Sequence, residues 1–198
     1  YGLQHPHLTT GGAESLREGL AERASVYANV ILTELAQRQS ESSFHLIGAS
    51  YGSLMAHRVA AHALKMGGSP EKLVMLDPLP APPYLKVIGR TATLHIAAAT
   101  LYEQTAAMFG ARVEDMEHVL SKMLSVPVDE LAIFLGEHLE AFLATKFGPG
   151  LVVSLTRQLH VVRQSQQHML EFGGGTLEPY THGALLAVTA SDRRFFKD

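Results

Sequence analysis

The stretch Phe44-His45-Leu46-Ile47-Gly48-Ala49-Ser50-Tyr51-Gly52 decides the fold, because an apolar run here ends in Gly-x-Ser-x-Gly. Downstream, apolar residues recur at the three- and four-residue spacing of a helix: Leu54, Met55, Val59 and Ala63. A serine between a buried strand and a helix lies on a tight turn, where Gly48 and Gly52 let strand and helix approach closely. A glycine-rich turn is the ordinary alternative, and the flanking strand and helix patterns disfavour it. The stretch therefore predicts a nucleophile elbow that presents Ser50 to a carbonyl.

A second short strand is predicted at residues 72–76, after the Gly-Gly-Ser-Pro turn at 67–70, and it ends in Asp77-Pro78. Catalytic and ligand groups collect at the carboxyl ends of strands in open α/β sheets. One helix and one turn separate Ser50 from Asp77, so we expect the two residues on neighbouring strands, facing the same edge. The alternative for Asp77 is a carboxylate that caps a turn. Asp192, after a third predicted strand at 183–189 that we expect to be buried, is the rival candidate for a catalytic acid.

Three segments, in this order, resemble the thioesterase domain that ends animal-type fatty-acid synthases and modular polyketide synthases. They are Tyr1-Gly2-Leu3-Gln4, Ala49-Ser50-Tyr51-Gly52 and Leu76-Asp77-Pro78-Leu79-Pro80. The resemblance covers nearly the whole chain and is strongest before Ala81. It implies an α/β-hydrolase-like fold: a mostly parallel sheet with a helical lid insertion.

The resemblance also implies a reaction. An acyl chain, carried as a thioester on the phosphopantetheine arm of an acyl carrier protein, would be released by water or by cyclisation. Ser50 would be the nucleophile, the Tyr51 N–H an oxyanion donor, and Asp77 the acid, since in this family the acid follows the strand after the elbow. Most α/β-hydrolases place the acid one strand later, where Asp192 stands, but the Leu-Asp-Pro-x-Pro context favours Asp77. The implied partners are the carrier protein, for which Arg58 and Lys65 offer a local basic patch, and the upstream synthase domains.

The alternation of strands and helices is interrupted in the middle of the chain. We expect residues 1–84 to form the first part of the hydrolase core, 85–150 a helical lid, and 151–198 the second part of the core. Within the core, the pattern predicts the tail of a strand at 1–4, a loop at 6–12, and helices at 14–39, 50–65 and 151–170.

The predicted lid carries apolar residues at helical spacing. They are Val113, Met116, Leu120 and Met123, followed by Leu131, Phe134, Leu139, Phe142 and Leu143. Phe134 and Phe142 are about two helical turns apart and so share one face, where they would line a groove for an apolar acyl chain. The alternative is that these side chains form the core of the lid itself.

A serine nucleophile needs a histidine base, which this fold places after a later strand. No histidine follows residues 183–189 in the sequence. His160 and His168 lie on the predicted helix at 151–170, and helix positions rarely replace the usual histidine loop. No His-Gly-Gly or equivalent loop for the second oxyanion donor precedes Tyr1. We therefore expect this sequence to be an internal segment of a larger domain, incomplete at both ends.

Composition narrows the class without identifying it. The chain has 198 residues, 46% of them hydrophobic, which is enough for a substantial core. The absence of cysteine excludes disulfides, thiolate metal sites and a cysteine nucleophile, and we expect a cytoplasmic protein. The net charge is −3 and the basic residues are scattered, so the sequence predicts no positive electrostatic field that would attract nucleic acid. No run approaches a membrane span, no His-Glu-x-x-His motif indicates a metal, and we expect no cofactor. Two other classes stay open: a carboxylic-ester hydrolase, and a non-catalytic acyl-binding or docking module.

Overall fold

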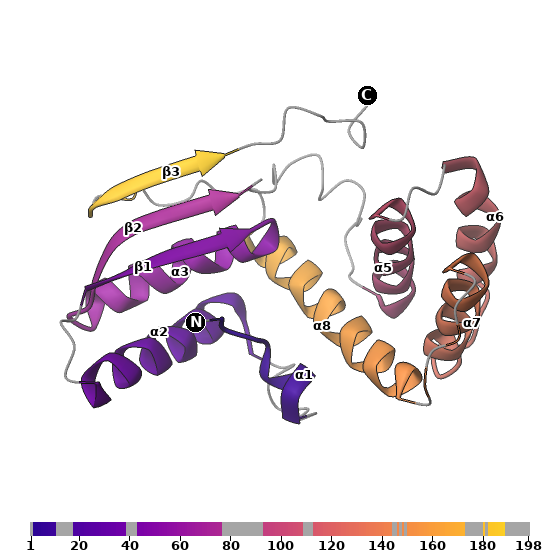
Figure 1. Ribbon diagram of the computed structural model, residues 1–198, viewed down its shortest axis with the longest axis horizontal. Helices are drawn as coiled ribbons and strands as arrows, with labels where there is room; N and C mark the ends of the chain where they lie inside the picture. The colour runs from indigo at the N-terminus through magenta and orange to yellow at the C-terminus, as the bar shows by residue number, and fades with distance from the viewer. Residues whose placement is uncertain are drawn as a thin grey trace. The chain divides into compact units, whose positions relative to one another are not determined.

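The computed structural model describes residues 2–10, 18–38, 43–76, 93–108, 113–143, 146, 148, 150–172, 180 and 182–188. It is a mixed α/β structure with a small parallel sheet and mostly helices (Figure 1). The chain divides into two compact units. The sheet unit comprises Glu18–Leu85 and Glu171–Asp198, and the helical unit comprises Tyr1–Arg17 and Lys86–Leu170.

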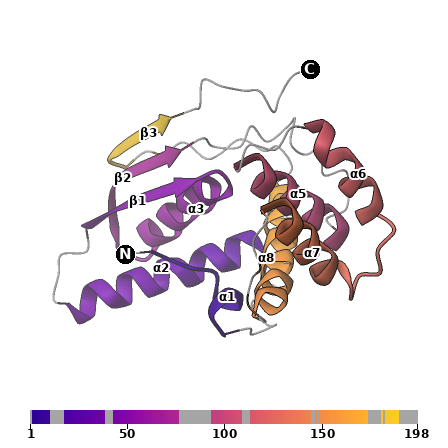
Figure 2. The same ribbon diagram turned by 45° about the vertical axis from the view of Figure 1, so that its right-hand side comes forward.

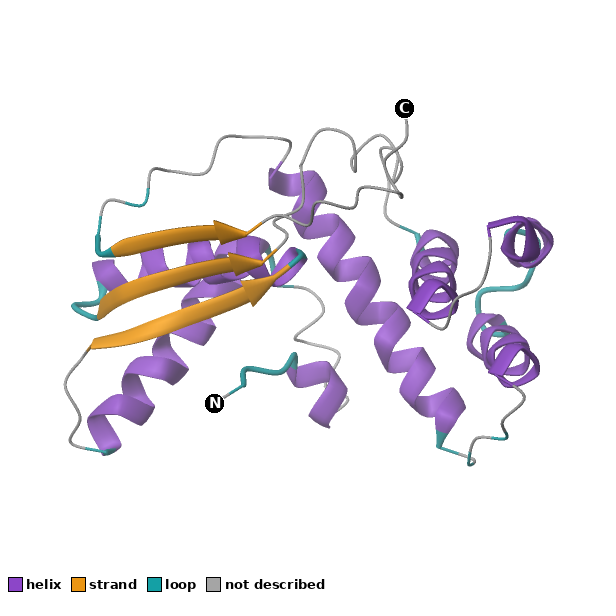
Figure 3. Ribbon diagram, turned by 45° about the horizontal axis from the view of Figure 1, so that its top comes forward, coloured by secondary structure: helices purple, strands orange, loops and turns teal. Residues whose placement is uncertain are grey.

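The sheet unit contains three parallel strands in the order β1-β2-β3, and Figure 3 shows all three running in the same direction. These are β1 (Ser43–Ala49), β2 (Ser69–Leu76) and β3 (Ala184–Val188). The helix α3 (Tyr51–Lys65) connects β1 to β2. The predicted adjacency of the two strands that precede Ser50 and Asp77 is therefore confirmed, with Ala49 opposite Leu76 in the register.

The core of the sheet unit lies on one face of the sheet. The helix α2 (Leu20–Gln37) packs on α3, and α3 packs on β1 and β2, so that α3 lies between α2 and the sheet (Figure 2). Alanines supply much of the contact between α2 and α3 and let the two helix backbones approach. This cluster consists of Leu20, Ala24, Ala28, Met55, Val59 and Ala63. Leu73 and Met75 of β2 pack against Ala56 of α3 in a second cluster.

Several boundaries differ from the sequence predictions. The helix expected at 14–39 begins at Leu20, because Glu18 is not helical and Gly19 is an extended N-cap residue with φ −72° and ψ 170°. The strand expected at 72–76 begins at Ser69, and the extra residues pair with β1 through an irregularity between Phe44 and His45. Ser50 is the N-cap of α3 rather than its first residue.

The predicted third strand is present as β3, but its described side chains are exposed, whereas the sequence predicts that they are buried. The side chains from Ala184 to Ala187 are all exposed, Leu186 by 56%. Within the described sheet β3 pairs with β2 alone, and α3 packs on β1 and β2. A run of apolar residues at an edge of the sheet therefore does not by itself produce burial.

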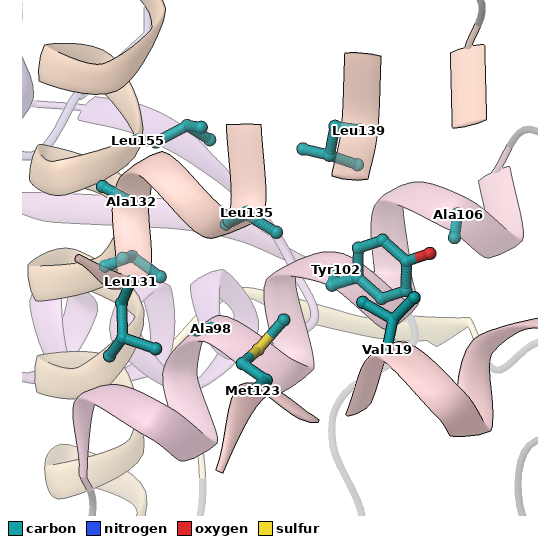
Figure 4. Packing of buried hydrophobic residues seen from close by; sticks show 11 residues of the cluster. Ala98, Tyr102, Ala106, Val119, Met123, Leu131, Ala132, Leu135, Leu139 and Leu155 are labelled. Carbon is teal, nitrogen blue, oxygen red and sulfur yellow. The ribbon is translucent and has the colours of Figure 1, made fainter. Parts of the chain in front are cut away.

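The helical unit has a core made by four helices: α5 (Leu94–Met108), α6 (Val113–Met123), α7 (Leu131–Leu143) and α8 (Leu151–Phe172). Figure 4 shows side chains from these helices converging in one cluster. Its largest members include Tyr102, Met123, Leu131, Leu135 and Leu155. The helical character predicted for residues 85–150 is thus confirmed for α5, α6 and α7.

The N-terminal residues belong to the helical unit. Gly2–His5 have no regular structure, and Pro6–Thr10 form the short helix α1 with proline at its first position, where the missing N–H costs nothing. The strand tail expected at 1–4 is therefore wrong for the described residues, and so is the loop expected from residue 6. His5 Nε2 lies 2.5 Å from Gln164 Oε1, and Arg157 Nη1 donates to the Leu8 carbonyl at 3.4 Å, so this segment contacts α8.

The division into units differs from the expected one. Residues 151–170, expected in the second part of the hydrolase core, lie in the helical unit together with residues 1–17. Among the described helices, none combines the length and the apolar character needed to cross a membrane.

Candidate active site

The turn between β1 and α3 has an unusual backbone at Ser50. With φ 51° and ψ −124°, Ser50 is the only residue other than glycine with positive φ in the described part of the chain. Such conformations cost on the order of 1–3 kcal/mol and persist only where the surrounding structure enforces them. Strain of this kind is typical of a nucleophile elbow, as the sequence predicts at this position.

The Ser50 hydroxyl is not used by the helix that follows it. A serine at an N-cap usually has an extended backbone and accepts a hydrogen bond from the first turn, but Ser50 makes no side-chain capping bond. Ser50 is also exposed. Its Oγ is therefore open to a substrate, and it lies at the N-terminal, positive end of the α3 dipole.

Gly48 explains how strand and helix approach at this turn. A Cβ added to Gly48 would lie 2.1 Å from the Gly52 carbonyl oxygen and 2.8 Å from the Ser53 Cα, so any larger residue would collide with backbone. A Cβ added to Gly52, in contrast, meets no described atom within 4 Å. The expectation that both glycines are needed for close approach is thus correct for Gly48, whereas no described atom requires glycine at position 52.

Hydrogen bonds join the elbow to the end of β2. The Ser50 N–H donates to the Leu76 carbonyl at 2.9 Å, and the Ser53 N–H donates to the Ser50 carbonyl at 2.9 Å. The Ser53 hydroxyl contacts both the Gly48 carbonyl, at 2.9 Å, and the Leu76 carbonyl, at 3.2 Å. Ser53 is completely buried. Sequence reasoning missed Ser53, because both of its acceptors are backbone carbonyls of other elements.

Tyr51 anchors the first turn of α3. Its ring packs against the α2–α3 cluster, and burial, followed by the nearby Tyr27 phenol, raises its pKa although the Arg23 cation opposes this. The phenol is therefore neutral at physiological pH, and its role at the elbow is packing. The Tyr51 N–H belongs to the first turn of α3, where backbone N–H groups have no acceptor within the helix. This is the position that the sequence predicts for an oxyanion donor.

The buried cation Arg23 lies behind Tyr51 in the sheet unit. Arg23 is 1% exposed, and its Nε is 3.1 Å from Glu18 Oε2. Its guanidinium carbon lies 5.8 Å from the centre of the Tyr27 ring. A buried charge needs partners of this kind, and here both lie at the start of α2 or just before it.

Asp77 is covalently bonded to Leu76, whose carbonyl accepts the Ser50 N–H. Both acids named from the sequence, Asp77 and its rival Asp192, lie outside the described residues. Their roles stay predictions. The structure brings the Ser50 turn and the carboxyl end of β2 together through Leu76.

No described histidine is hydrogen-bonded to the Ser50 hydroxyl. His168 is 1% exposed on α8. The His57 ring, buried on α3, lies 6.5 Å from the Tyr180 ring, and His138 Nδ1 lies 2.9 Å from the Phe134 carbonyl of its own helix. The structure therefore does not identify the histidine that a Ser50 nucleophile would need among the described residues.

The two phenylalanines expected in an acyl groove lie on the same helix, α7, in different surroundings. Phe134 is half-buried against the core of the helical unit and stacks on His138, with ring centres 4.1 Å apart. Phe142 is exposed. Met123, Leu131 and Leu139 are core residues of the unit. The alternative, that these residues form the core of the helical segment itself, therefore holds for Met123, Leu131 and Leu139. The Phe142 side chain, in contrast, is exposed and accessible to a ligand.

Among the described residues, no group of three or more histidine, aspartate or glutamate side chains could hold a metal ion. Comparison with known proteins found no protein-family model that matches the chain and no curated protein with significant similarity to it.

Proposed function

We propose that this protein is a serine thioesterase of the α/β-hydrolase type. It would release an acyl or polyketide chain from the phosphopantetheine thioester of an acyl carrier protein. The observation that carries the proposal is the Ser50 turn: a strained, exposed serine between a parallel strand and a helix, with a hydroxyl that does not cap the helix. Backbone strain of this kind clusters at functional positions.

The chemistry follows from this placement. Ser50 Oγ attacks the thioester carbonyl carbon, and a histidine accepts the hydroxyl proton as the bond forms. The carbonyl oxygen becomes an oxyanion, for which the Tyr51 N–H and the N-terminal end of α3 supply positive charge. The tetrahedral intermediate collapses, the C–S bond breaks, and the histidine returns the proton to the departing thiol. Water, or a hydroxyl of the acyl chain, then attacks the Ser50 ester and regenerates the serine.

Asp77 is the proposed partner of the histidine. It follows the strand next to the elbow strand, and the Ser50 N–H bonds to the carbonyl of the residue before it. We expect Asp77→Asn to lower turnover by on the order of 10³ to 10⁴, since the neutral amide leaves the imidazole in the wrong tautomer. Asp192→Asn should cost less than about tenfold if Asp192 only caps a turn. The reverse ranking would assign the acid to Asp192.

The acyl chain is the proposed ligand of the helical unit. Phe142 of α7 presents an exposed aromatic surface. An aromatic surface suits a hydrocarbon chain.

Covalent labelling tests the proposal. A fluorophosphonate should add to wild-type protein at a single serine, located by mass spectrometry of peptides, and Ser50→Ala should abolish the adduct. Ser125→Ala, which removes an exposed hydroxyl that donates to the Lys122 carbonyl, is the matched control and should label like wild type. Equal labelling of wild type and Ser50→Ala would remove Ser50 from the mechanism. If the protein hydrolyses free carboxylic esters faster than carrier-bound thioesters, its substrates are carboxylic esters and the proposed substrate class is wrong.

A further inference from the structure

We infer that Ser53 is a positioning residue for the Ser50 nucleophile, acting through its hydroxyl on the two strand ends that flank the elbow. This inference rests on the proposed function. Ser53 lies in the first turn of α3 and is 0% exposed, so it cannot touch solvent, and a role in substrate contact is excluded. Any contribution to the reaction must come through the groups that it holds.

The hydrogen bonds of Ser53 differ from those of other hydroxyls on the described helices. Serine and threonine within a helix commonly bond to a carbonyl three or four residues earlier in the same helix. Thr100, Thr156 and Ser165 do so, with donor–acceptor distances of 2.8 to 2.9 Å. Ser53 instead reaches out of its helix to the Gly48 carbonyl of β1 and the Leu76 carbonyl of β2.

The Leu76 carbonyl is the point where these bonds meet. It accepts the Ser50 N–H at 2.9 Å and is 3.2 Å from the Ser53 hydroxyl, which uses both lone pairs of the oxygen. The Gly48 carbonyl, 2.9 Å from the same hydroxyl, belongs to the residue whose lack of a side chain permits the close turn. One buried side chain thus ties together the elbow strand, the elbow helix and the strand that leads into Asp77.

The Ser53 hydroxyl has one proton, so it either donates one bifurcated hydrogen bond to both carbonyls or donates to each of them in turn. Either arrangement resists separation of the strand ends and keeps the Ser50 backbone in its strained conformation. Reacting atoms must lie about 3 Å apart in a defined direction, and a misplacement of about 1 Å can cost on the order of 10²-fold in rate. Ser53 therefore acts on the geometry of Ser50 rather than on binding of the acyl chain.

Two substitutions at Ser53 test this inference. Ser53→Ala removes the donor and creates no clash, and Ser53→Cys keeps a similar shape with a weaker donor. We expect Ser53→Ala to lower both kcat and the second-order rate constant of fluorophosphonate labelling by about 10- to 100-fold, with KM unchanged. Ser53→Cys should be intermediate in both measurements. Ser165→Ala, which removes a hydroxyl bonded within its own helix, is the control and should match wild type.

Each rate is measured at least 10 °C below the melting temperature of that variant, so that loss of folded protein does not contribute. If Ser53→Ala does not fold, the kcat and the labelling rate of Ser53→Cys alone test the inference. Variants that melt at a lower temperature but react and label like wild type would overturn the inference and leave Ser53 as a packing residue. A wild type that labels at Ser50 but does not turn over thioesters would overturn the proposed function alone, since the labelling series still reports on Ser53.

Discussion

The strain at Ser50 is sustained by neighbours of two kinds, a residue with no side chain and a residue with a buried hydroxyl. Gly48 allows the Gly52 carbonyl to pass close to β1, and Ser53 ties the turn to the ends of β1 and β2. Neither would touch a substrate. Because Gly48 acts by the space that it leaves, its contribution can be measured as stability, independently of any assay of activity.

We expect Gly48→Ala to destabilise the protein by about 3 kcal/mol, near the upper end for overpacked sites, because its Cβ would meet backbone that cannot rotate away. Gly52→Ala should change stability by less than about 1 kcal/mol, since its Cβ meets no described atom within 4 Å and alanine favours a helix. Urea denaturation followed by circular dichroism gives both values. Equal tolerance of alanine at the two positions would contradict the close approach of the Gly48 Cα to α3.

At the scale of elements, the contact of α1 with α8 brings three histidines and two arginines together. His7 lies edge-on to His160, with ring centres 5.8 Å apart, and His5, Arg157 and Arg163 are the other cations or potential cations at this contact. Burial lowers the pKa of His160, and Arg163 and His7 lower it further. The folded protein therefore favours the neutral His160 ring.

The consequence is a loss of stability in acid. When the pKa of His160 is lower in the folded than in the unfolded chain, the unfolded chain binds more protons below the ordinary histidine pKa near 6.5. Stability from the neutral ring is complete above this pH and is lost as the pH falls toward the folded pKa. We expect His160→Gln to show a smaller decrease in melting temperature between pH 7.5 and 5.5 than wild type. His118→Gln, at an exposed position on α6, is the control and should follow wild type.

Two phenylalanines of α7 are expected to have different roles, one in the core and one in binding the acyl chain. Phe134 packs on the core, so Phe134→Ala should lower stability by about 2–4 kcal/mol and reduce turnover by one uniform factor for all chain lengths. Phe142 is exposed, so Phe142→Ala should leave stability within about 1 kcal/mol of wild type. If Phe142 lines the acyl groove, the ratio of kcat/KM between adjacent even chain lengths should shift by up to about tenfold. A series of acyl thioesters from short to long distinguishes these cases, and a flat ratio for Phe142→Ala would contradict the groove.

Across the whole molecule, local patterns predicted the elements well and their surroundings poorly. The turn at Ser50, the parallel pairing of β1 with β2 and the helices α5, α6 and α7 follow from periodicity and from the glycine-rich motif. The position of the N-terminal segment in the helical unit could not be predicted from local patterns. The residues that contact it, such as Gln164, are far away in sequence. Ser53 was missed for a different reason: its acceptors are backbone carbonyls of two strands, and no sequence pattern connects a helix residue to both.

The two faces of the sheet supply the last prediction. Leu73 points to α3 and is 0% exposed, whereas Ile47, on the opposite face of the neighbouring strand β1, is 70% exposed, and Leu186 is 56% exposed on the same side. An apolar side chain stabilises a fold only when folding removes it from water. The sequence alone does not distinguish Ile47 from Leu73, since both stand in apolar runs.

We therefore expect opposite responses to substitution on the two faces. Leu73→Ala should destabilise the chain by about 2–5 kcal/mol, through lost burial and a cavity beneath α3. Ile47→Thr keeps a branched strand former and should alter stability by less than about 0.5 kcal/mol. It should also reduce binding of the dye ANS and self-association, because it removes apolar surface from an exposed face. Denaturation curves and sedimentation velocity measure these effects. A cost for Ile47→Thr as large as that for Leu73→Ala would mean that the face carrying Ile47 is covered in solution.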